Sequence, residues 1–315
     1  DDCSEIIPNW LRFIPGVVDS QDISLNISRE MLQNNPIISK IKNGITNKIL
    51  NEIENLSKKE KNQYDKFWNN FGAIIKEGLY EFNDFQNKLL TLVRFKSTFN
   101  DDLISLDDYM KKIKKEQKEI YYFSNFDKNN KNIKKSPQLE TFIEINIPVI
   151  LMTDPVDEFW LQNITKFKDK EFKSITKGSI NLDKDNIKNS DKIPNNINNL
   201  INILKHELKE KIKDVKISNR LTKSPLILVA DESGIDINME KLMKIQNQNI
   251  SDNKKILEIN PKHLMIIKIS ESLDKLDHKK LSNLILDNAN ILDGNLIENP
   301  SNYMEMLTEI FIKQN

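Results

Sequence analysis

The residue types that most often carry out chemistry are sparse in this chain. Cys3 is its only cysteine, which excludes an internal disulfide and a cysteine zinc site. The three histidines (His206, His263 and His278) are far apart and show no HExxH or HxxxH spacing, so a histidine-rich metal centre is not expected. Neither a G-x-S-x-G motif nor a P-loop is present. The sequence therefore gives little support to a self-contained hydrolase.

Arginine is rare, whereas isoleucine, asparagine and lysine are used heavily throughout the chain. Such a bias is typical of an AT-rich genome, so an arginine that is retained carries more information than a lysine. Arg29 lies between Ser28 and Glu30 at a predicted helix start, where Ser28 is a plausible N-cap. From residue types alone, the ordinary role for such an arginine is an ion pair with a neighbouring acid.

Two adjacent aromatic residues, Phe159 and Trp160, follow the carboxylates Asp157 and Glu158 at another predicted helix start. Neighbouring residues on a helix point about 100° apart, so both rings cannot face one core, and we expect one of them to be exposed. Core packing is the ordinary role of such aromatics. An exposed ring would instead favour binding of apolar polypeptide segments.

Met239, Leu242 and Met243 share one face of a later predicted helix. Such a face is usually part of a core. Methionine is also the adaptable residue of promiscuous binding surfaces, so a binding role stays open.

Charge and hydropathy exclude several classes of partner. Lys plus Arg and Asp plus Glu are both 47, so the formal net charge is zero and nothing attracts the whole chain to nucleic acid or anionic lipid. The lysines at 111, 112, 114 and 115 are interleaved with Glu116 and Glu119, which is typical of a solvated helix face. No apolar run is long enough to span a membrane. We therefore expect neither a nucleic-acid nor a membrane partner.

Hydrophobic periodicity indicates an α/β fold. Apolar residues spaced by three or four predict helices at 38–56, 61–75, 85–94, 106–118, 156–167, 196–212, 281–292 and 303–311. Apolar runs predict strands at 120–123, 148–152, 215–217, 226–229 and 256–259. The first two strands enclose a helix that begins at Ser136 and Pro137, which predicts a parallel, right-handed βαβ unit. The polar, Asn-rich residues 181–199 indicate a domain boundary.

The segment Gly16–Gln33 resembles the signature segment of the heat shock protein 90 chaperones. It departs from the family pattern at Gln21, where Glu is common, and at Ser24, where Pro is common. Six further blocks resemble the same family in the same order: Tyr121–Tyr122, Met152–Glu158, Ser218–Leu221, Ser224–Pro225, Asn238–Lys244 and Glu258–His263. The resemblance covers essentially the whole chain, and without a long acidic linker or acidic tail it points to the bacterial form.

The resemblance implies a fragment, because the family's N-terminal nucleotide-binding domain and the first part of its middle domain have no counterpart here. The implied fold is α/β, or α+β overall. It comprises βαβ middle-domain pieces joined by a helical coil, then an α+β C-terminal dimerisation domain that ends in a helical bundle. The implied parts are the end of the large middle subdomain (1–56), the helical coil and connection (57–104), the small α/β middle subdomain (105–185) and the dimerisation domain (195–315).

The resemblance also implies a catalytic role for Arg29. In the family, this arginine reaches the γ-phosphate of ATP held by the N-terminal domain, where a guanidinium neutralises charge on the transferring phosphoryl group. Gln33 resembles the residue that helps to position that loop, and Asn26 is expected to brace it. ATP with Mg is thus the expected cofactor of the full-length protein, and this chain alone is expected to bind none.

Finally, the resemblance implies a cytoplasmic chaperone that holds partly folded client proteins in a dimeric clamp. The client-binding residues would be Glu158, Phe159, Trp160, Met239, Leu242 and Met243. The homodimer interface would be Leu281, Leu284, Ile285, Leu292, Tyr303, Leu307, Ile310 and Phe311.

Two alternatives remain open from the sequence. The closing helices could form an intramolecular hairpin, although pairing across a two-fold axis would bury more surface. The chain could also be a stand-alone α/β scaffold or dimerisation module with no link to a nucleotide. Restoring the missing N-terminal domain would separate these functions, because only the chaperone should then show Arg29-dependent ATP hydrolysis.

Overall fold

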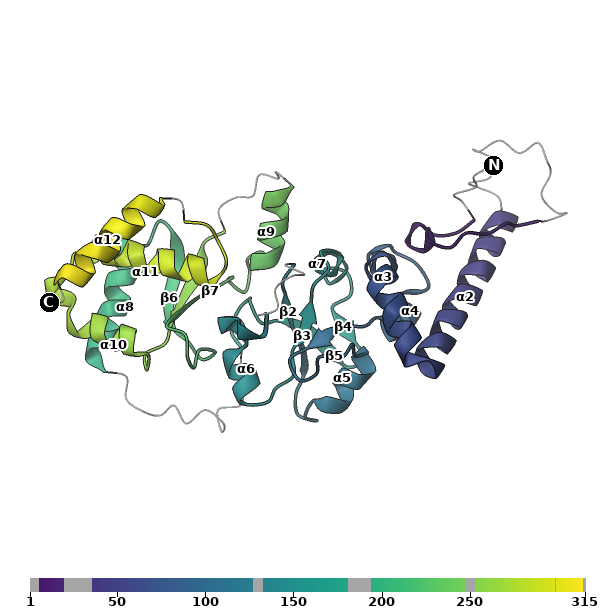
Figure 1. Ribbon diagram of the computed structural model, residues 1–315, viewed down its shortest axis with the longest axis horizontal. Helices are drawn as coiled ribbons and strands as arrows, with labels where there is room; N and C mark the ends of the chain where they lie inside the picture. The colour runs from purple at the N-terminus through teal and green to yellow at the C-terminus, as the bar shows by residue number, and fades with distance from the viewer. Residues whose placement is uncertain are drawn as a thin grey trace. The chain divides into compact units, whose positions relative to one another are not determined.

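The computed structural model describes residues 6–19, 36–126, 133–180, 194–246, 253–297 and 299–313. Its contacts divide the chain into two compact units, shown with all elements in Figure 1. Unit 1 comprises residues 1–120 and 150–172, and unit 2 comprises residues 121–149 and 173–315. Helices and mixed sheets together make this an α/β protein, as predicted.

Three helices occupy the first part of unit 1: α2 (Pro36–Lys59), α3 (Lys61–Tyr80) and α4 (Gln86–Leu92). The predicted amphipathic helix is confirmed as α2, which buries Ile38, Leu50 and Ile53 on one side. The next predicted helix runs on from Ile75 to Tyr80. Its added turn is stabilised by burial of Leu79, which belongs to the core of this unit.

A short 3-10 helix, η1 (Asn9–Leu11), packs against α3. Trp10 and Leu11 are buried, and the Trp10 indole lies directly over Gly78 of α3. A Cβ atom at Gly78 would come within 2.7 Å of the Trp10 ring. This position therefore needs a glycine for close approach, although glycine weakens a helix interior.

Five short strands form one sheet in the order β1-β3-β2-β5-β4. The predicted strands are confirmed as β2 (Glu119–Ser124) and β3 (Ile150–Met152). The parallel direction of that pair stays a prediction. β3 pairs antiparallel with β1 (Lys96–Ser97), and β4 (Lys166–Phe167) pairs antiparallel with β5 (Lys170–Ser174).

The helix predicted over 156–167 is wrong in its second half. The helix α7 is only Val156–Trp160, and Phe167 lies in β4. The chain reverses between β4 and β5 at Lys168, whose φ of 55° is the left-handed value that a tight turn requires. Apolar spacing at 156–167 was compatible with a helix, but the antiparallel pairing of β4 and β5 prevails.

Helix α5 (Leu106–Lys112) also ends earlier than the predicted residue 118. Its start is fixed by a capping box in which Ser105 accepts from the Asp108 amide and Asp108 accepts from the Ser105 amide. Ser136 is confirmed as a helix start, since it caps η3 (Pro137–Leu139), which leads into α6 (Glu140–Glu144) after η2 (Ile133–Lys135).

Unit 2 contains a three-stranded sheet in the order β6-β8-β7, built from β6 (Ile212–Ile217), β7 (Leu226–Val229) and β8 (Lys255–Ile259). β8 runs parallel to β6 and antiparallel to β7. Helices pack against this sheet and one another (Figure 1). They are α8 (Asn195–Glu207), α10 (Leu264–Glu271), α11 (His278–Leu292) and α12 (Pro300–Lys313), with the 3-10 turn η5 (Leu273–Lys275) before α11. Helix α9 (Ile237–Ile245) lies between β7 and β8 in the chain and projects away from the sheet in Figure 1.

Two local devices set the ends of these helices. His263 caps α10, because its Nδ1 accepts a hydrogen bond of 3.1 Å from the Met265 amide. Helix α11 ends in a Schellman motif at Gly294, whose φ is 78°. The Gly294 amide donates to the Ile291 carbonyl and the Asn295 amide donates to the Asn290 carbonyl.

Candidate functional site

The three residues predicted to act in ATP hydrolysis, Asn26, Arg29 and Gln33, lie outside the residues that the structure describes. The structure therefore bears on the predicted binding surfaces and on the closing helices. The aromatic pair of α7 belongs to unit 1. The methionine helix α9 and the closing helices α11 and α12 belong to unit 2.

A buried ion cluster fixes α7 on α3. The Lys76 Nζ lies 2.8 Å from Asp157 Oδ2 and 3.1 Å from Asp154 Oδ2, and both Lys76 and Asp157 are buried. The Asp157 Oδ1 accepts a 2.8 Å hydrogen bond from Trp160 Nε1, and the Lys76 ammonium lies 4.4 Å from the centre of the Phe95 ring. Burial raises the pKa of Asp157, and the charge of Lys76 opposes that rise.

This cluster closes Trp160 into the core, where the ring packs edge-on against Phe172. Glu158 is also buried. Trp160 and Glu158 are thus both buried in this structure, and their predicted role in client binding stays a prediction. Of the predicted client-binding residues on α7, Phe159 alone remains partly accessible.

Phe159 contacts an exposed aromatic residue that was not predicted from the sequence. Its ring packs edge to face against Tyr80, with ring centres 6.0 Å apart, and Tyr80 is 52% exposed. Phe82, two residues after Tyr80 in the chain, is fully exposed. The Asn163 Nδ2 donates to the Tyr80 carbonyl, which holds this end of α3 against the turn that follows α7. The alternation Tyr80-Glu81-Phe82 beyond a predicted helix was the sequence signal. We call Tyr80, Phe82 and Phe159 the aromatic surface.

Helix α9 is anchored by its N-cap, Asp236. One carboxylate oxygen accepts from the Asn238 amide, and the other accepts from Ser174 Oγ at 2.5 Å and Thr176 Oγ1 at 2.7 Å. All of these side chains are buried. The first turn of α9 is thereby tied to the last residue of β5 and to the residues that follow it.

The three predicted binding residues of α9 separate into two environments. Leu242 is buried, so its predicted contact with clients is not available at the surface of this structure. Met239 and Met243 are half-buried and share one side of the helix. Ile245 at the end of α9 is exposed.

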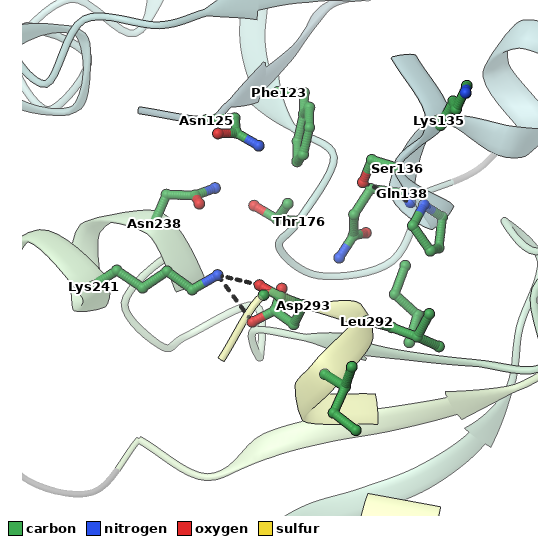
Figure 2. Close-up of a pocket in the computed structure, with 14 residues that line it drawn as sticks. Phe123, Asn125, Lys135, Ser136, Gln138, Thr176, Asn238, Lys241, Leu292 and Asp293 are labelled. Atoms are coloured by element: carbon green, nitrogen blue, oxygen red, sulfur yellow. Dashed lines mark hydrogen bonds and ion pairs between the residues drawn. The ribbon is translucent and has the colours of Figure 1, made fainter. Parts of the chain in front are cut away.

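A hollow of about 360 Å³ lies beside α9 on its other side. Figure 2 shows the carboxamides of Asn125, Gln138 and Asn238 around this hollow, with Thr176 between them. The end of α11 supplies an aliphatic wall. Below it, Lys241 Nζ binds both the Asp293 carbonyl, at 2.7 Å, and its carboxylate, at 3.1 Å.

A second, apolar hollow of about 630 Å³ lies between α10, α11 and α12, where Leu284 and Leu307 form part of its lining. The residues predicted to form the dimer interface fall into a buried and an exposed group. Leu281 and Ile285 belong to the core of unit 2 and Leu284 is buried, so these three pack within the chain as the hairpin alternative required. Leu292 is 40% exposed, and the side chains of Ile310 and Phe311 lie outside the described part of the chain.

Tyr303 also makes an internal contact, because its hydroxyl lies 3.1 Å from Asn288 Oδ1 and donates to it. This bond joins α12 to α11. The helical hairpin is thus stabilised within one chain. Among the predicted interface residues whose side chains the structure describes, Leu292 is exposed and Tyr303 and Leu307 are partly accessible.

Arg220, which lies in one of the blocks that carried the resemblance, has a structural role. It is buried, and its Nε donates to Glu258 Oε2 at 3.1 Å. Its two terminal nitrogens donate to the carbonyls of Ile175 and Gly178. Glu140 makes a similar connection, because its carboxylate accepts from the amides of residues 222–224. These contacts hold residues 140 and 175–178 to the loop before β7.

Within the described ranges, no group of His, Cys, Asp or Glu side chains is arranged to hold a metal ion. None of the helices described is both long and apolar enough to cross a membrane.

Comparison with known proteins gives a match over the whole chain. A family model described as Hsp90 protein matches residues 1–314. Chaperone protein HtpG of Roseobacter denitrificans is 42% identical over 98% of this chain. The proteins of the same name from Orientia tsutsugamushi and Rickettsia canadensis are each 40% identical over 96% and 99% of it. The chain spans about half the length of these curated relatives, 51–52%.

Proposed function

Because this chain belongs to the Hsp90 family of chaperones, we propose that it is the part of a chaperone that binds partly folded client proteins. The family match over residues 1–314 carries this proposal. The aromatic surface of unit 1 supports it, since Tyr80 and Phe82 expose apolar area that no core of a folded monomer requires. The half-buried Met239 and Met243 offer a second, adaptable apolar face.

Binding to an unfolded protein tests this function. The probe is a reduced, carboxymethylated protein that stays unfolded in buffer, and its affinity for the chain is measured by fluorescence anisotropy. Replacing Tyr80, Phe82 and Phe159 with serine should weaken binding by about tenfold, because several contacts of aromatic area are lost together. Phe99→Ser is the matched control, since Phe99 is partly exposed elsewhere in unit 1. Equal affinity in the triple variant and the wild type would contradict a client role for this surface.

We propose in addition that Arg29 acts in ATP hydrolysis when the N-terminal nucleotide-binding domain is present, with ATP and Mg held by that domain. The support is the Ser28-Arg29-Glu30 segment within the family match. A guanidinium supplies planar, permanently charged donors for a transferring phosphoryl group. The same membership supports a cytoplasmic location and a dimeric clamp built by the closing helices.

Steady-state kinetics of the full-length protein test this role. Arg29→Ala should leave ATP affinity nearly intact and lower turnover by about 10²–10³, as for other preorganised charge-stabilising donors. Arg12→Ala is the control, because Arg12 is an exposed arginine paired with Glu77. A variant that loses affinity but keeps its turnover per bound nucleotide would exclude the proposed role.

A further inference from the structure

The hollow beside α9 contains a buried acceptor that the described part of the chain leaves without a donor. Gln138 is 3% exposed. Its Nε2 donates to the Leu228 carbonyl at 3.0 Å, which fixes the orientation of the carboxamide, while Oε1 has no hydrogen-bond partner among the described residues. Buried carboxamide oxygens in folded proteins almost always accept a hydrogen bond. The Gln138 Oε1 is therefore an acceptor that an N–H group of a ligand could satisfy.

The charges at the hollow favour an uncharged ligand. Lys241 and Asp293 pair with each other, so neither offers an unpaired charge to an anion or a cation. Lys135 also borders the hollow, but Figure 2 shows its ammonium pointing away from it. Lys255 lies 3.9 Å from the same Asp293 carboxylate, and its burial lowers its pKa. Recognition must then come from hydrogen bonds and apolar contact.

The lining supplies both. A carboxamide has the donor and acceptor types that pair with a peptide group, and the acceptor that lacks a partner among the described residues is Gln138 Oε1. Three carboxamides, on Asn125, Gln138 and Asn238, surround the hollow (Figure 2). Ile291 and Leu292 form an aliphatic wall and are 41% and 40% exposed. The Schellman motif that ends α11 holds this wall in place.

We propose that this hollow binds a short, extended and uncharged segment of an unfolded client polypeptide. Gln138 Oε1 accepts a backbone N–H of the segment, and one aliphatic side chain of the segment rests on Ile291 and Leu292. The volume of about 360 Å³ lies near the lower end of the roughly 300–1,000 Å³ that is usual for ligand sites. This inference rests on the proposed client-binding function. It adds a site that recognises the backbone of a client segment through a hydrogen bond.

The site is separate from the methionine face of the same helix. Asn238 and Lys241 are three residues apart and share one side of α9, whereas Met239 and Met243 share a side about 150° away. Substitutions on one side can therefore be made without touching the other. The two sides of α9 are expected to bind client segments independently.

The probe for the test is the peptide N-acetyl-Ala-Leu-Ala-amide, titrated into the whole chain with NMR detection of isoleucine methyl and side-chain carboxamide signals. We expect the Ile291 methyl and the Gln138 carboxamide signals to shift and the Ile245 methyl signal to stay unchanged. Ile291→Ser should weaken binding about tenfold, while Ile245→Ser is the matched control on an exposed isoleucine outside the hollow. A bound peptide that leaves the Ile291 signal unmoved would overturn the proposal, as would no binding.

N-methylation of the peptide tests the hydrogen bond itself. Each peptide N–H is methylated in turn. At one position, N-methylation should weaken binding of the peptide to the wild type about tenfold. The same N-methylation should not weaken binding to Gln138→Met, because the hydrogen bond is already absent there and the two changes are not additive. A loss of the same size in both proteins would exclude Gln138 as the acceptor. Should Gln138→Met misfold, the Ile291→Ser result still decides whether the peptide uses the hollow.

The two proposals fail in different ways. If the unfolded-protein probe binds through the aromatic surface but the peptide does not reach the hollow, only the inference about the hollow is wrong. If the peptide binds at the hollow while the unfolded protein binds nowhere, the proposed client function is wrong and the hollow is a peptide site of another kind.

Discussion

At the scale of single residues, the most consequential group is Lys76, which no motif identified. Lysine is so common in this chain that Lys76 had no distinguishing signal, and its partners Asp154 and Asp157 lie far along the sequence. The available signal was its position on the buried side of α3, where Trp68, Gly72, Ile75 and Leu79 are also buried. A charge in that stripe requires a partner from elsewhere in the fold.

Replacing Lys76 with methionine should destabilise unit 1 by about 3–5 kcal/mol, because Asp157 is left as an uncompensated buried charge. All three tryptophans (Trp10, Trp68 and Trp160) lie in unit 1, so urea unfolding followed by tryptophan fluorescence reports on this unit alone. Lys58→Met is the matched control. It breaks an exposed pair with Glu54 and should cost no more than about 0.5 kcal/mol. If both variants lost the same free energy of unfolding, the buried ion cluster would contribute no more to stability than an exposed ion pair.

The same variant should have a characteristic pH dependence. Without Lys76, the hydrogen bond from Trp160 is the remaining contact that opposes the rise that burial causes in the pKa of Asp157. The folded chain then takes up a proton at a higher pH than the unfolded chain, so its free energy of unfolding should rise as the pH falls toward the ordinary pKa of an aspartate, about 4. The difference in free energy of unfolding between the wild type and Lys76→Met should therefore become smaller as the pH falls. The double variant Lys76→Met, Asp157→Asn lacks the titrating carboxyl and should show no such narrowing.

At the scale of elements, periodicity predicted the long helices well and the short strands poorly. The repeated isoleucines of α2 and the apolar runs of β7 and β8 are confirmed, because these elements bury continuous faces. β1 and β4 have only two residues each, too few to show alternation, and β5 (Lys170–Ser174) has only Ser174 buried, so none was predicted. Periodicity also could not tell which ring of the aromatic pair is buried. Trp160 rather than Phe159 is buried because the ion cluster around Lys76, which lies far away in the sequence, holds its indole.

The anchor of α9 gives a prediction at this scale. Asp236→Ala removes the N-cap, worth about 0.5–2 kcal/mol, and leaves the hydroxyls of Ser174 and Thr176 without their shared acceptor. The amides of the first turn of α9 should therefore exchange with deuterium at least about tenfold faster, as mass spectrometry of peptides from this helix would show.

Asp277→Ala provides the comparison for that experiment. Asp277 caps α11 through the Lys280 amide and is exposed, whereas Asp236 is buried. Its loss should accelerate exchange at the start of α11 and leave α9 unchanged. If α9 keeps its protection in Asp236→Ala, the helix is held by its apolar contacts and not by this cap.

At the scale of the whole molecule, the closing helices have both an internal and an external apolar side. Leu281 and Ile285 complete the core of unit 2, which explains why the sequence alone could not separate a hairpin from a dimer interface. Yet Met304 and Ile312 of α12 remain exposed. Apolar residues that a hairpin leaves uncovered on its outer helix are typical of an interface between copies.

We therefore expect the chain to be a dimer, and the double variant Met304→Asp, Leu307→Asp to be a monomer. A charge without a partner in an apolar seam is unfavourable, and a two-fold interface contains each substitution twice. The control Ile143→Asp, Ile245→Asp places the same charges on two exposed isoleucines of α6 and α9 and should keep the wild-type mass. Light scattering with an unchanged circular dichroism spectrum would establish dissociation without unfolding. A wild-type chain that is monomeric at tens of micromolar would remove the dimeric clamp, and a double variant that unfolds would instead assign Leu307 to the core within one chain.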